Sequence, residues 1–305
     1  MRHVNPKVIL YLGVLGTAFS ALLVRLSEAP SLTTATLRLF WTVLLLTPMT
    51  FLRHREEVKQ ATRGDILACV ASGIFLAFHF ATWFESLKWT TIASSSVLGC
   101  TEVIFVALGF AIFLKGKIPR LGVVAIILSL GGSVILALHD SGGGSAAPAP
   151  LYGDFLAVIC AICISVYTLI GRVKRGTMST TVYTFFTYIA CLATLLVLDL
   201  VTGTKITGWG LWEQAIGLGL AVLCTLLGHS LFSWSLKYLS PSYVAAAKLC
   251  EPIFSSALAI PLFLEIPGPV QLVGAAILLA GVFLYTKAEG KQSSDTVAES
   301  PAQDG

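Results

Sequence analysis

The stretch SLKWTTIASSSVLGCTEVIF at residues 86–105 returns as SLKYLSPSYVAAAKLCEPIF at residues 235–254. Ser, Leu, Lys, an aromatic residue, Glu, Ile and Phe coincide between the two stretches at a constant offset of 149 residues. A proline and a glycine in each half continue the correspondence at an offset of 150: Pro119 with Pro269, and Gly131 with Gly281. These matches predict that the chain consists of two similar halves.

The composition places both halves in a lipid bilayer. Of the 305 residues, 56% are hydrophobic and 12% are charged, and the mean hydropathy is +0.85. Soluble globular chains carry about 25% charged residues, so a water-solvated fold is excluded. The hydrophobic residues form continuous runs instead of the alternating pattern of a membrane β-barrel. The sequence therefore predicts an all-α, polytopic membrane protein.

A spanning helix needs about 20 mostly apolar residues, because about 30 Å of hydrocarbon must be crossed. By that criterion the chain contains ten predicted transmembrane helices, at residues 8–26, 32–52, 65–86, 93–114, 120–138, 151–170, 179–201, 213–234, 241–263 and 268–287. Residues 1–140 hold five of them, and residues 151–287 hold the other five after a linker at 141–150. Five crossings is an odd number, so the second half must lie inverted in the membrane relative to the first. Inverted repeats are typical of secondary transporters, whose substrate site lies near the midplane between the repeats.

The basic residues predict the orientation. With the N-terminus in the cytoplasm, fifteen Lys and Arg residues fall on the cytoplasmic side and three on the other, namely Arg25, Lys88 and Lys205. Positive residues are enriched in cytoplasmic loops, so we expect a multi-pass protein of the cell membrane with both termini in the cytoplasm. The linker at 141–150 is then periplasmic. Residues 288–305, rich in Ser, Asp and Glu, are predicted to form a disordered cytoplasmic tail.

Four charged residues lie well inside the predicted helices, away from the helix ends. Glu102 and Glu251 lie near the middle of the fourth and ninth helices at equivalent positions of the repeat, and Arg38 and Lys248 lie about a third of the way in. A charge at the centre of the bilayer costs roughly 2.5–3.5 kcal/mol, so such residues face an internal cavity or a partner. We expect Glu102 and Glu251 to bind a proton or a cationic group and Arg38 or Lys248 to hold a substrate carboxylate. Two acids and two bases suit a zwitterion such as an amino acid.

Helical periodicity adds polar and aromatic neighbours on the same faces. The further candidates for substrate binding or coupling are Ser95, Ser255, His79, Trp83, Trp41 and Tyr188. Such faces suit a site that hydrogen-bonds a small polar solute between aromatic walls. Pro252 is expected to kink the ninth helix beside Glu251.

Each candidate has a structural alternative. Lys248 and Glu251, three residues apart on one helix, neutralise each other in one interpretation. In another, Arg38 is the structural partner of Glu102. His79 is alternatively a hydrogen-bonded packing residue. The three large aromatic candidates are alternatively buried in the core or against lipid: Trp41, Trp83 and Tyr188.

The order of several motifs carries a family resemblance. These motifs are the two Ser-Leu-Lys-aromatic helix starts, Glu102-Val-Ile-Phe105 and Glu251-Pro-Ile-Phe254, Phe263-Leu264-Glu265 ahead of Pro269 and Gln271, and His79-Phe80-Ala-Thr-Trp83 together with Arg38. In this order they resemble the drug/metabolite transporter superfamily, specifically its EamA-type members, over residues 8–287. The resemblance implies a ten-helix bundle whose cavity is formed mainly by helices 1–4 and 6–9, with helices 5 and 10 at the periphery. It also implies transport of amino acids or other small metabolites, often outward and often coupled to protons.

The sequence thus predicts a secondary active transporter that moves small polar metabolites across the cytoplasmic membrane by alternating access, as proton-coupled efflux. The alternatives are an integral membrane enzyme, a passive scaffold or channel, and a transporter of another solute class, such as organic cations or nucleotide-type metabolites. No HExxH, GxSxG or phosphate-loop motif is present, which disfavours an enzyme and excludes ATP-driven transport by this chain alone. We expect no cofactor, no metal site and no nucleic-acid partner. The seven cysteines, including the Cys160-x-x-Cys163 pair, are interpreted as small apolar residues. The oligomeric state is left open.

Overall fold

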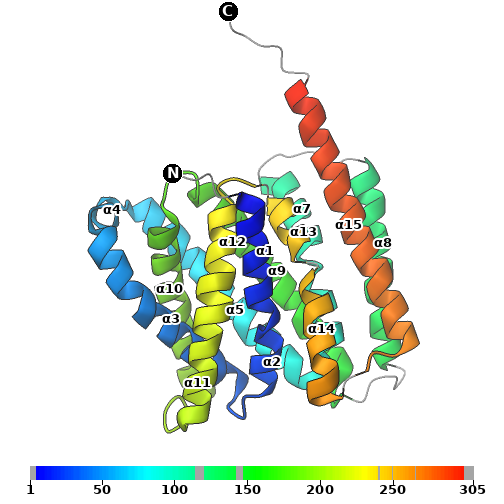
Figure 1. The fold of residues 1–305 in the computed structure, drawn as a ribbon, viewed down its shortest axis with the longest axis horizontal. Helices are drawn as coiled ribbons and strands as arrows, with labels where there is room; N and C mark the ends of the chain where they lie inside the picture. Colours follow the sequence, from blue (N-terminus) through cyan, green and yellow to red (C-terminus); the bar gives the residue numbers. More distant parts are fainter. Residues whose placement is uncertain are drawn as a thin grey trace, which may run out of the picture.

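The computed structural model describes residues 5–113, 120–141, 147–239, 241–248, 250–264 and 266–298, and over these residues it contains helices and no strand. The helices pack side by side into a bundle (Figure 1). In chain order they are α1 Pro6–Ala18, α2 Ser20–Arg25, α3 Ser31–Arg53, α4 Arg55–Gln60, α5 Arg63–Trp89, α6 Ile92–Gly99, α7 Glu102–Phe113, α8 Arg120–Ser141, α9 Pro150–Lys174, α10 Thr180–Thr202, α11 Leu211–Gly219, the π-helix η1 Leu220–His229, α12 Ser230–Ser235, α13 Pro241–Ala247, α14 Cys250–Phe263 and α15 Pro269–Ala298.

Eight stretches of the described chain are long and apolar enough to cross a membrane. They are Pro6–Arg25, Ser31–Arg53, Arg63–Trp89, Ile92–Phe113, Pro150–Lys174, Thr180–Thr202, Leu211–Ser235 and Tyr243–Phe263. Shorter apolar helices, Arg120–Leu136 and Pro269–Tyr285, occupy the places of the fifth and tenth predicted spans. The prediction of an all-α, multi-pass membrane protein is therefore confirmed, while the arrangement as two inverted sets of five helices stays a prediction.

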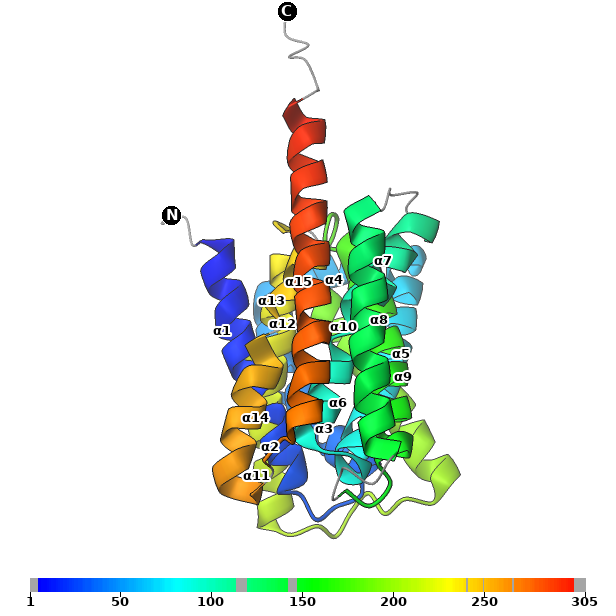
Figure 2. The same ribbon diagram turned by 90° about the vertical axis from the view of Figure 1, so that its right-hand side faces the viewer.

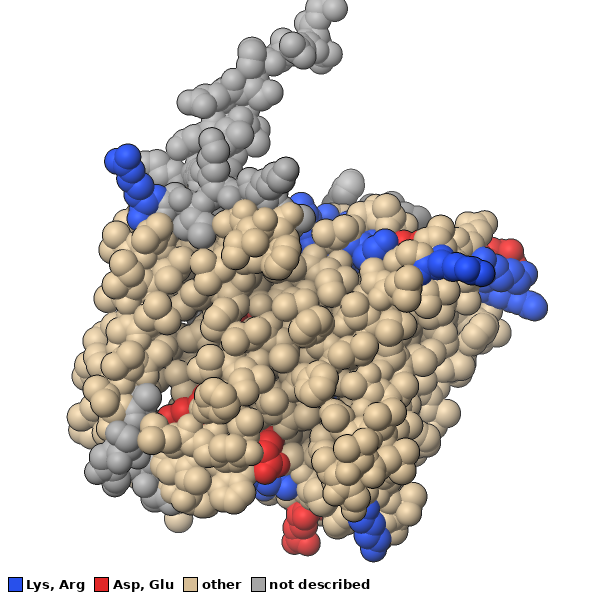
Figure 3. All heavy atoms as spheres, turned by 180° about the vertical axis from the view of Figure 1, so that it is seen from behind, with Lys and Arg blue, Asp and Glu red and all other residues tan. Residues whose placement is uncertain are grey.

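Most charged side chains on the surface lie near the ends of the bundle and not around its middle. On the face shown in Figure 3, Lys, Arg, Asp and Glu gather mostly toward two opposite ends of the molecule, and the broad belt between them carries few charged side chains. Large apolar side chains are exposed on several helices, for example Phe40 of α3, Ile127 of α8 and Val197 of α10. Exposed apolar surface of this extent suits contact with lipid acyl chains.

Local sequence signals set several helix ends. Thr62 and Asp65 form a reciprocal capping box at the start of α5, in which the Asp65 N–H donates to Thr62 Oγ1 (3.1 Å) and the Thr62 N–H donates to Asp65 Oδ2 (3.1 Å). Gly203 ends α10 in the left-handed conformation, with φ of 69°, which a glycine adopts without steric cost. These signals place the observed ends within a few residues of the predicted ones.

The fourth and ninth predicted spans are both broken, whereas the sequence predicted a continuous fourth helix and a kink beside Glu251 in the ninth. The fourth consists of α6 and α7, separated by turns in which the N–H groups of Cys100 and Thr101 each donate to the carbonyl three residues earlier. The ninth consists of α13 and α14, and Pro252 follows this break and has no N–H to donate. As a result Glu102 is the first residue of α7 and Glu251 the second residue of α14, so both repeated acids lie at breaks.

α8 and α15 form a pair at one edge of the bundle (Figures 1 and 2). They approach closely at glycines: a Cβ on Gly132 would lie 2.5 Å from the backbone nitrogen of Leu278, and one on Gly281 would lie 2.7 Å from that of Ser129. Small residues allow such close backbone contact between membrane helices. α15 continues to Ala298, beyond the end at residue 287 predicted for the last span, so residues 288–298 are helical where a disordered tail was expected. Residues 299–305 of that tail and 142–146 of the linker lie outside the described residues.

Candidate functional site

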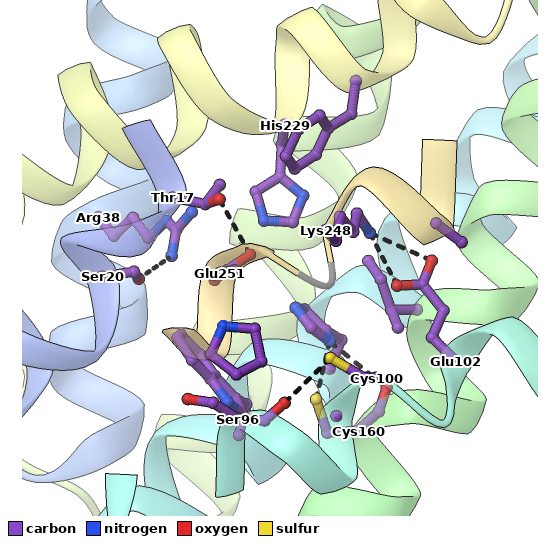
Figure 4. Close-up of a pocket in the computed structure, with 17 residues that line it drawn as sticks. Thr17, Ser20, Arg38, Ser96, Cys100, Glu102, Cys160, His229, Lys248 and Glu251 are labelled. Carbon is purple, nitrogen blue, oxygen red and sulfur yellow. Dashed lines mark hydrogen bonds and ion pairs between the residues drawn. The ribbon is translucent and has the colours of Figure 1, made fainter. Parts of the chain in front are cut away.

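The interior of the bundle contains a cavity of about 70 Å³. Side chains from seven of the ten predicted spans line it, whereas α8, α10 and α15 contribute no residue to the described lining. Six of the residues predicted from sequence face this cavity: Arg38, His79, Trp83, Glu102, Lys248 and Glu251. Figure 4 shows Arg38 and Glu251 on one side of it and Lys248 and Glu102 on the other.

The other four candidates do not line the cavity. Ser95 is fully buried and accepts a hydrogen bond from Ser86 Oγ at 2.8 Å. Ser255 donates to Ser96 Oγ at 3.4 Å, one layer away from the cavity. Tyr188 is buried on α10 against Ser230 (3.1 Å between the hydroxyl oxygens), and the Trp41 ring N–H donates to Gln214 Oε1 at 3.1 Å. These placements agree with the core-packing alternative for the two aromatic residues.

Glu102 and Lys248 form a buried ion pair across the cavity. The Lys248 Nζ lies 2.8 Å from Glu102 Oε2 and 3.1 Å from Oε1, and the two side chains are 14% and 6% exposed. Thr168 Oγ1 on α9 donates a further hydrogen bond to Glu102 Oε1 at 3.0 Å. Both pairings considered from the sequence, Lys248 with Glu251 and Arg38 with Glu102, are therefore absent. The break before α14 places Lys248 in a turn, so its side chain does not follow the helical spacing that would bring it to Glu251.

Glu251 has different surroundings. Its Oε2 accepts a hydrogen bond from Thr17 Oγ1 on α1 at 3.0 Å. Among the residues that the structure describes, no Lys, Arg or His nitrogen lies within 4 Å of its carboxylate. Glu251 is thus a partly buried acid with one neutral hydrogen-bond partner and no direct counter-ion.

Arg38 is held rigidly in the wall of the cavity at 1% exposure. Its Nε donates to Thr225 Oγ1 in the π-helix η1 at 2.7 Å, and its Nη1 donates to Ser20 Oγ at 3.2 Å. The guanidinium carbon lies 4.2 Å from the centroid of the Phe80 ring, which is the geometry of a cation–π contact. The remaining nitrogen, Nη2, is buried without a hydrogen-bond partner.

Two histidines and a cysteine complete the polar lining. His79 Nδ1 lies 3.0 Å from Cys160 Sγ, and the His79 ring is parallel to that of Trp83 at 6.4 Å between centroids. His229 packs edge-on to His79 at 5.9 Å. Among the described residues, no group of three or more His, Cys, Asp or Glu side chains is arranged to hold a metal ion.

Sequence reasoning missed several lining residues, namely Thr17, Ser20, Ser96, Cys100, Cys160, His229 and Phe232. The sequence indicates only a small apolar role for Cys160, and the three-dimensional neighbours of Cys160 and His229 reveal that both residues line the cavity. Thr17 carries no signal, because a single threonine in an apolar helix is common in membrane proteins.

A second cavity of about 380 Å³ lies toward the ends of α2 and α14. One face of α14 lines both cavities, with Pro252 in the first and Ser256, Ala259 and Phe263 in the second. α6 does the same with Ser96 and Gly99 in the first and Ala93 in the second. The two cavities are therefore stacked along α6 and α14.

A multi-pass helical bundle with a lipid-facing belt and a charged internal cavity defines a membrane protein that handles a solute within its helices. The sequence profile of the EamA-like transporter family matches residues 6–138 and 151–287, and the chain belongs to that family. It is a membrane transporter.

Relatives named as transporters agree with this assignment, and a solved structure shares the fold. An uncharacterized transporter of Clostridium kluyveri is 25% identical over 78% of each chain. One from Archaeoglobus fulgidus is 26% identical over 70% of this chain and 73% of the relative, and the uncharacterized transporter YxxF of Bacillus subtilis is 24% identical over 77% and 75%. A crystal structure superposes with a TM-score of 0.67 at 16% identity, covering 94% of this chain and 98% of the other, which shows a shared fold.

Proposed function

We propose that the protein is a secondary active transporter that exports a small zwitterionic metabolite of the amino-acid type in exchange for protons. In this proposal α8 and α15 complete ten spans, the two halves are inverted repeats, and both termini lie in the cytoplasm. The breaks at Glu102 and Glu251 support the repeat, because the two acids lie 149 residues apart and begin the second segments of equivalent spans. Broken helices at the midplane are typical of transporters built from inverted repeats.

The stacked cavities support a pathway for the solute between α6 and α14. With the cytoplasmic end assigned as above, the second cavity opens toward the outside, and the hydrogen-bonded Ser96 and Ser255 separate it from the central one. Ligand pockets usually measure about 300–1,000 Å³, so a central cavity of about 70 Å³ corresponds to a closed site. Movement of the short segments α6 and α14 about their breaks would enlarge it.

The observation that carries the coupling proposal is the difference between the two repeated acids. Glu102 is paired with Lys248, whereas Glu251 has no direct counter-ion among the described residues. A carboxylate whose neighbours change between two conformations can load and release a proton. A proton and a substrate ammonium group would then compete for Glu251. Because only one of them binds at a time, outward movement of the substrate would be coupled to inward movement of a proton.

The test is the substitution Glu251→Gln in membrane vesicles. Vesicles containing the purified protein are loaded with a mixture of amino acids and other small metabolites, and released compounds are measured with and without an imposed pH gradient. We expect wild type to release at least one compound faster when the gradient is present. Glu251→Gln should be incorporated normally and lose at least ~90% of the gradient-driven part, because a proton must bind at that carboxylate.

The matched control is Glu85→Gln, the same change at an acid of α5 that bonds the Trp89 ring N–H (2.7 Å) and does not line the central cavity. It should retain gradient-driven release. Equal gradient-driven release by Glu251→Gln and wild type would contradict the coupling role.

A further inference from the structure

Two of the four charges in the central cavity, Glu102 and Lys248, form an ion pair. The other two have only neutral hydrogen-bond partners among the described residues: Glu251 accepts from Thr17, and Arg38 donates to Thr225 and Ser20. No carboxylate of the described residues lies within 4 Å of the Arg38 guanidinium. Arginine stays protonated in proteins, so the cavity wall holds a buried cation without an anion.

Such a cation is expensive to bury. Desolvation of an ion costs several kcal/mol in a protein interior, and it is compensated only by close, well-oriented partners of opposite charge. The cation–π contact with Phe80 and the two bonds to hydroxyl groups offset part of that cost, but they leave Nη2 without an acceptor. The arginine is therefore anchored by three neutral groups, and both N–H donors of its Nη2 are unused.

A second unused nitrogen belongs to the same cavity. The Nδ1 of His229 is buried without a hydrogen-bond partner, and His229 lines the cavity together with Arg38. A neutral imidazole protonated on Nδ1 is a hydrogen-bond donor. Two residues that line the cavity, one of them a cation, thus each hold a buried nitrogen without a hydrogen-bond partner among the described residues.

We infer that Arg38 is the binding point for a carboxylate group of the substrate, with its Nη2 donating to one carboxylate oxygen and His229 Nδ1 available as a second donor. This inference rests on the proposed function, in that it names the chemical group by which the transported solute is recognised. It assigns the carboxylate to Arg38 and not to Lys248, because Lys248 is already occupied by Glu102. Trp83 and Phe232 supply apolar walls beside this point.

The test measures equilibrium binding and needs no transport. The melting temperature of the purified full chain in detergent is recorded with four matched pairs of probes at equal ionic strength: acetate and acetamide, propionate and propionamide, lactate and lactamide, and L-alanine and L-alaninamide. A ligand that binds only the folded protein raises its melting temperature. We expect at least one carboxylate to raise it more than the paired amide does, and we expect Arg38→Gln to remove that difference.

Two further variants keep the result interpretable. Arg38→Lys retains the charge but lacks the planar arrangement of donors, so it should keep a reduced preference for the carboxylate. Arg25→Gln, the same change at the arginine of the second cavity, should keep the full preference. Wild-type protein that prefers no carboxylate over its amide would overturn the inference, and so would an unchanged preference in Arg38→Gln. Failure of the proposed proton coupling would appear in the flux of Glu251→Gln and leave these binding differences intact.

Discussion

The two broken spans of the transporter present the same residue type at equivalent positions and surround it differently. Glu102, at the start of α7, is locked by Lys248 and Thr168 in a buried ion pair. Glu251, at the start of α14, has only the hydroxyl of Thr17. The repeated sequence therefore supplies two similar helix breaks, and the side chains around them pair one acid with a cation and leave the other with a neutral hydrogen-bond partner.

The largest effect on this difference between Glu102 and Glu251 is expected from Lys248→Met, which removes the counter-ion of Glu102. Removing the cation leaves Glu102 buried and unpaired, which should lower the free energy of unfolding by about 3–5 kcal/mol. Thermal and denaturant unfolding of the purified protein measure the loss. The double variant Lys248→Met, Glu102→Met should recover most of it, because no unpaired charge remains. If the single variant is as stable as wild type, the ion pair does not stabilise the contact between α7 and the turn that joins α13 to α14.

A smaller effect is expected from the two hydroxyl donors. Thr168→Val removes a hydrogen bond to the carboxylate that also pairs with Lys248, which contributes about 1.5–3 kcal/mol, whereas Thr17→Val removes a hydrogen bond to a carboxylate without a direct counter-ion, which contributes about 0.5–1.5 kcal/mol. The same unfolding measurement, made on both variants, compares the two acids directly. The expected order is a larger loss for Thr168→Val. Equal losses would show that the two carboxylates are held alike, and the reverse order would show that Glu251 is held more strongly.

The smallest effect should come from the serine pair that bridges the two broken spans. Ser255 donates to Ser96 at 3.4 Å, a long hydrogen bond, so Ser255→Ala should cost no more than about 0.5 kcal/mol. The substitution should instead change how easily a thiol reagent reaches the central cavity. In a background without native cysteines, a cysteine introduced at Gly99 of the central cavity should react faster when Ser255→Ala is also present. A cysteine introduced at Ser256 of the second cavity is the control, and its reaction rate should not change. Unchanged reaction at Gly99→Cys would show that the pair does not limit access.

The sequence allowed much of the scaffold to be predicted, for definite physical reasons. The length of apolar runs is set by the thickness of the bilayer, so the spans could be located without knowing their neighbours. The cost of burying charge placed Glu102, Glu251, Arg38 and Lys248 in the interior, and all four line one cavity. The repeat identified the two acids as equivalent.

The partners of these charges could not be predicted in the same way. Helical periodicity assumes an unbroken helix, and the breaks before Glu102 and Glu251 change the direction of nearby side chains such as Lys248. Pro252 marked one break, but the first half has Val103 at that place and carries no such signal. Trp41 and Tyr188 shared predicted faces with polar residues, yet their contacts with neighbouring helices turn them away from the cavity.

The π-helix η1 changes the direction in which side chains point between the two ends of its span. In η1 the Thr225 hydroxyl donates to the carbonyl of Leu220, five residues earlier, and the Ser230 N–H donates to the carbonyl of Thr225. Each turn of this kind holds more residues than the 3.6 of an α-helix. The side chains after the segment therefore point in different directions from those that a continuous α-helix would give them. On the α11 side, Gly217 packs against Leu37 of α3, and on the α12 side, a Cβ on Gly13 of α1 would touch the ring of Phe232. Loss of one residue from this segment would rotate every later side chain of the span by about 100° and carry His229 away from Arg38.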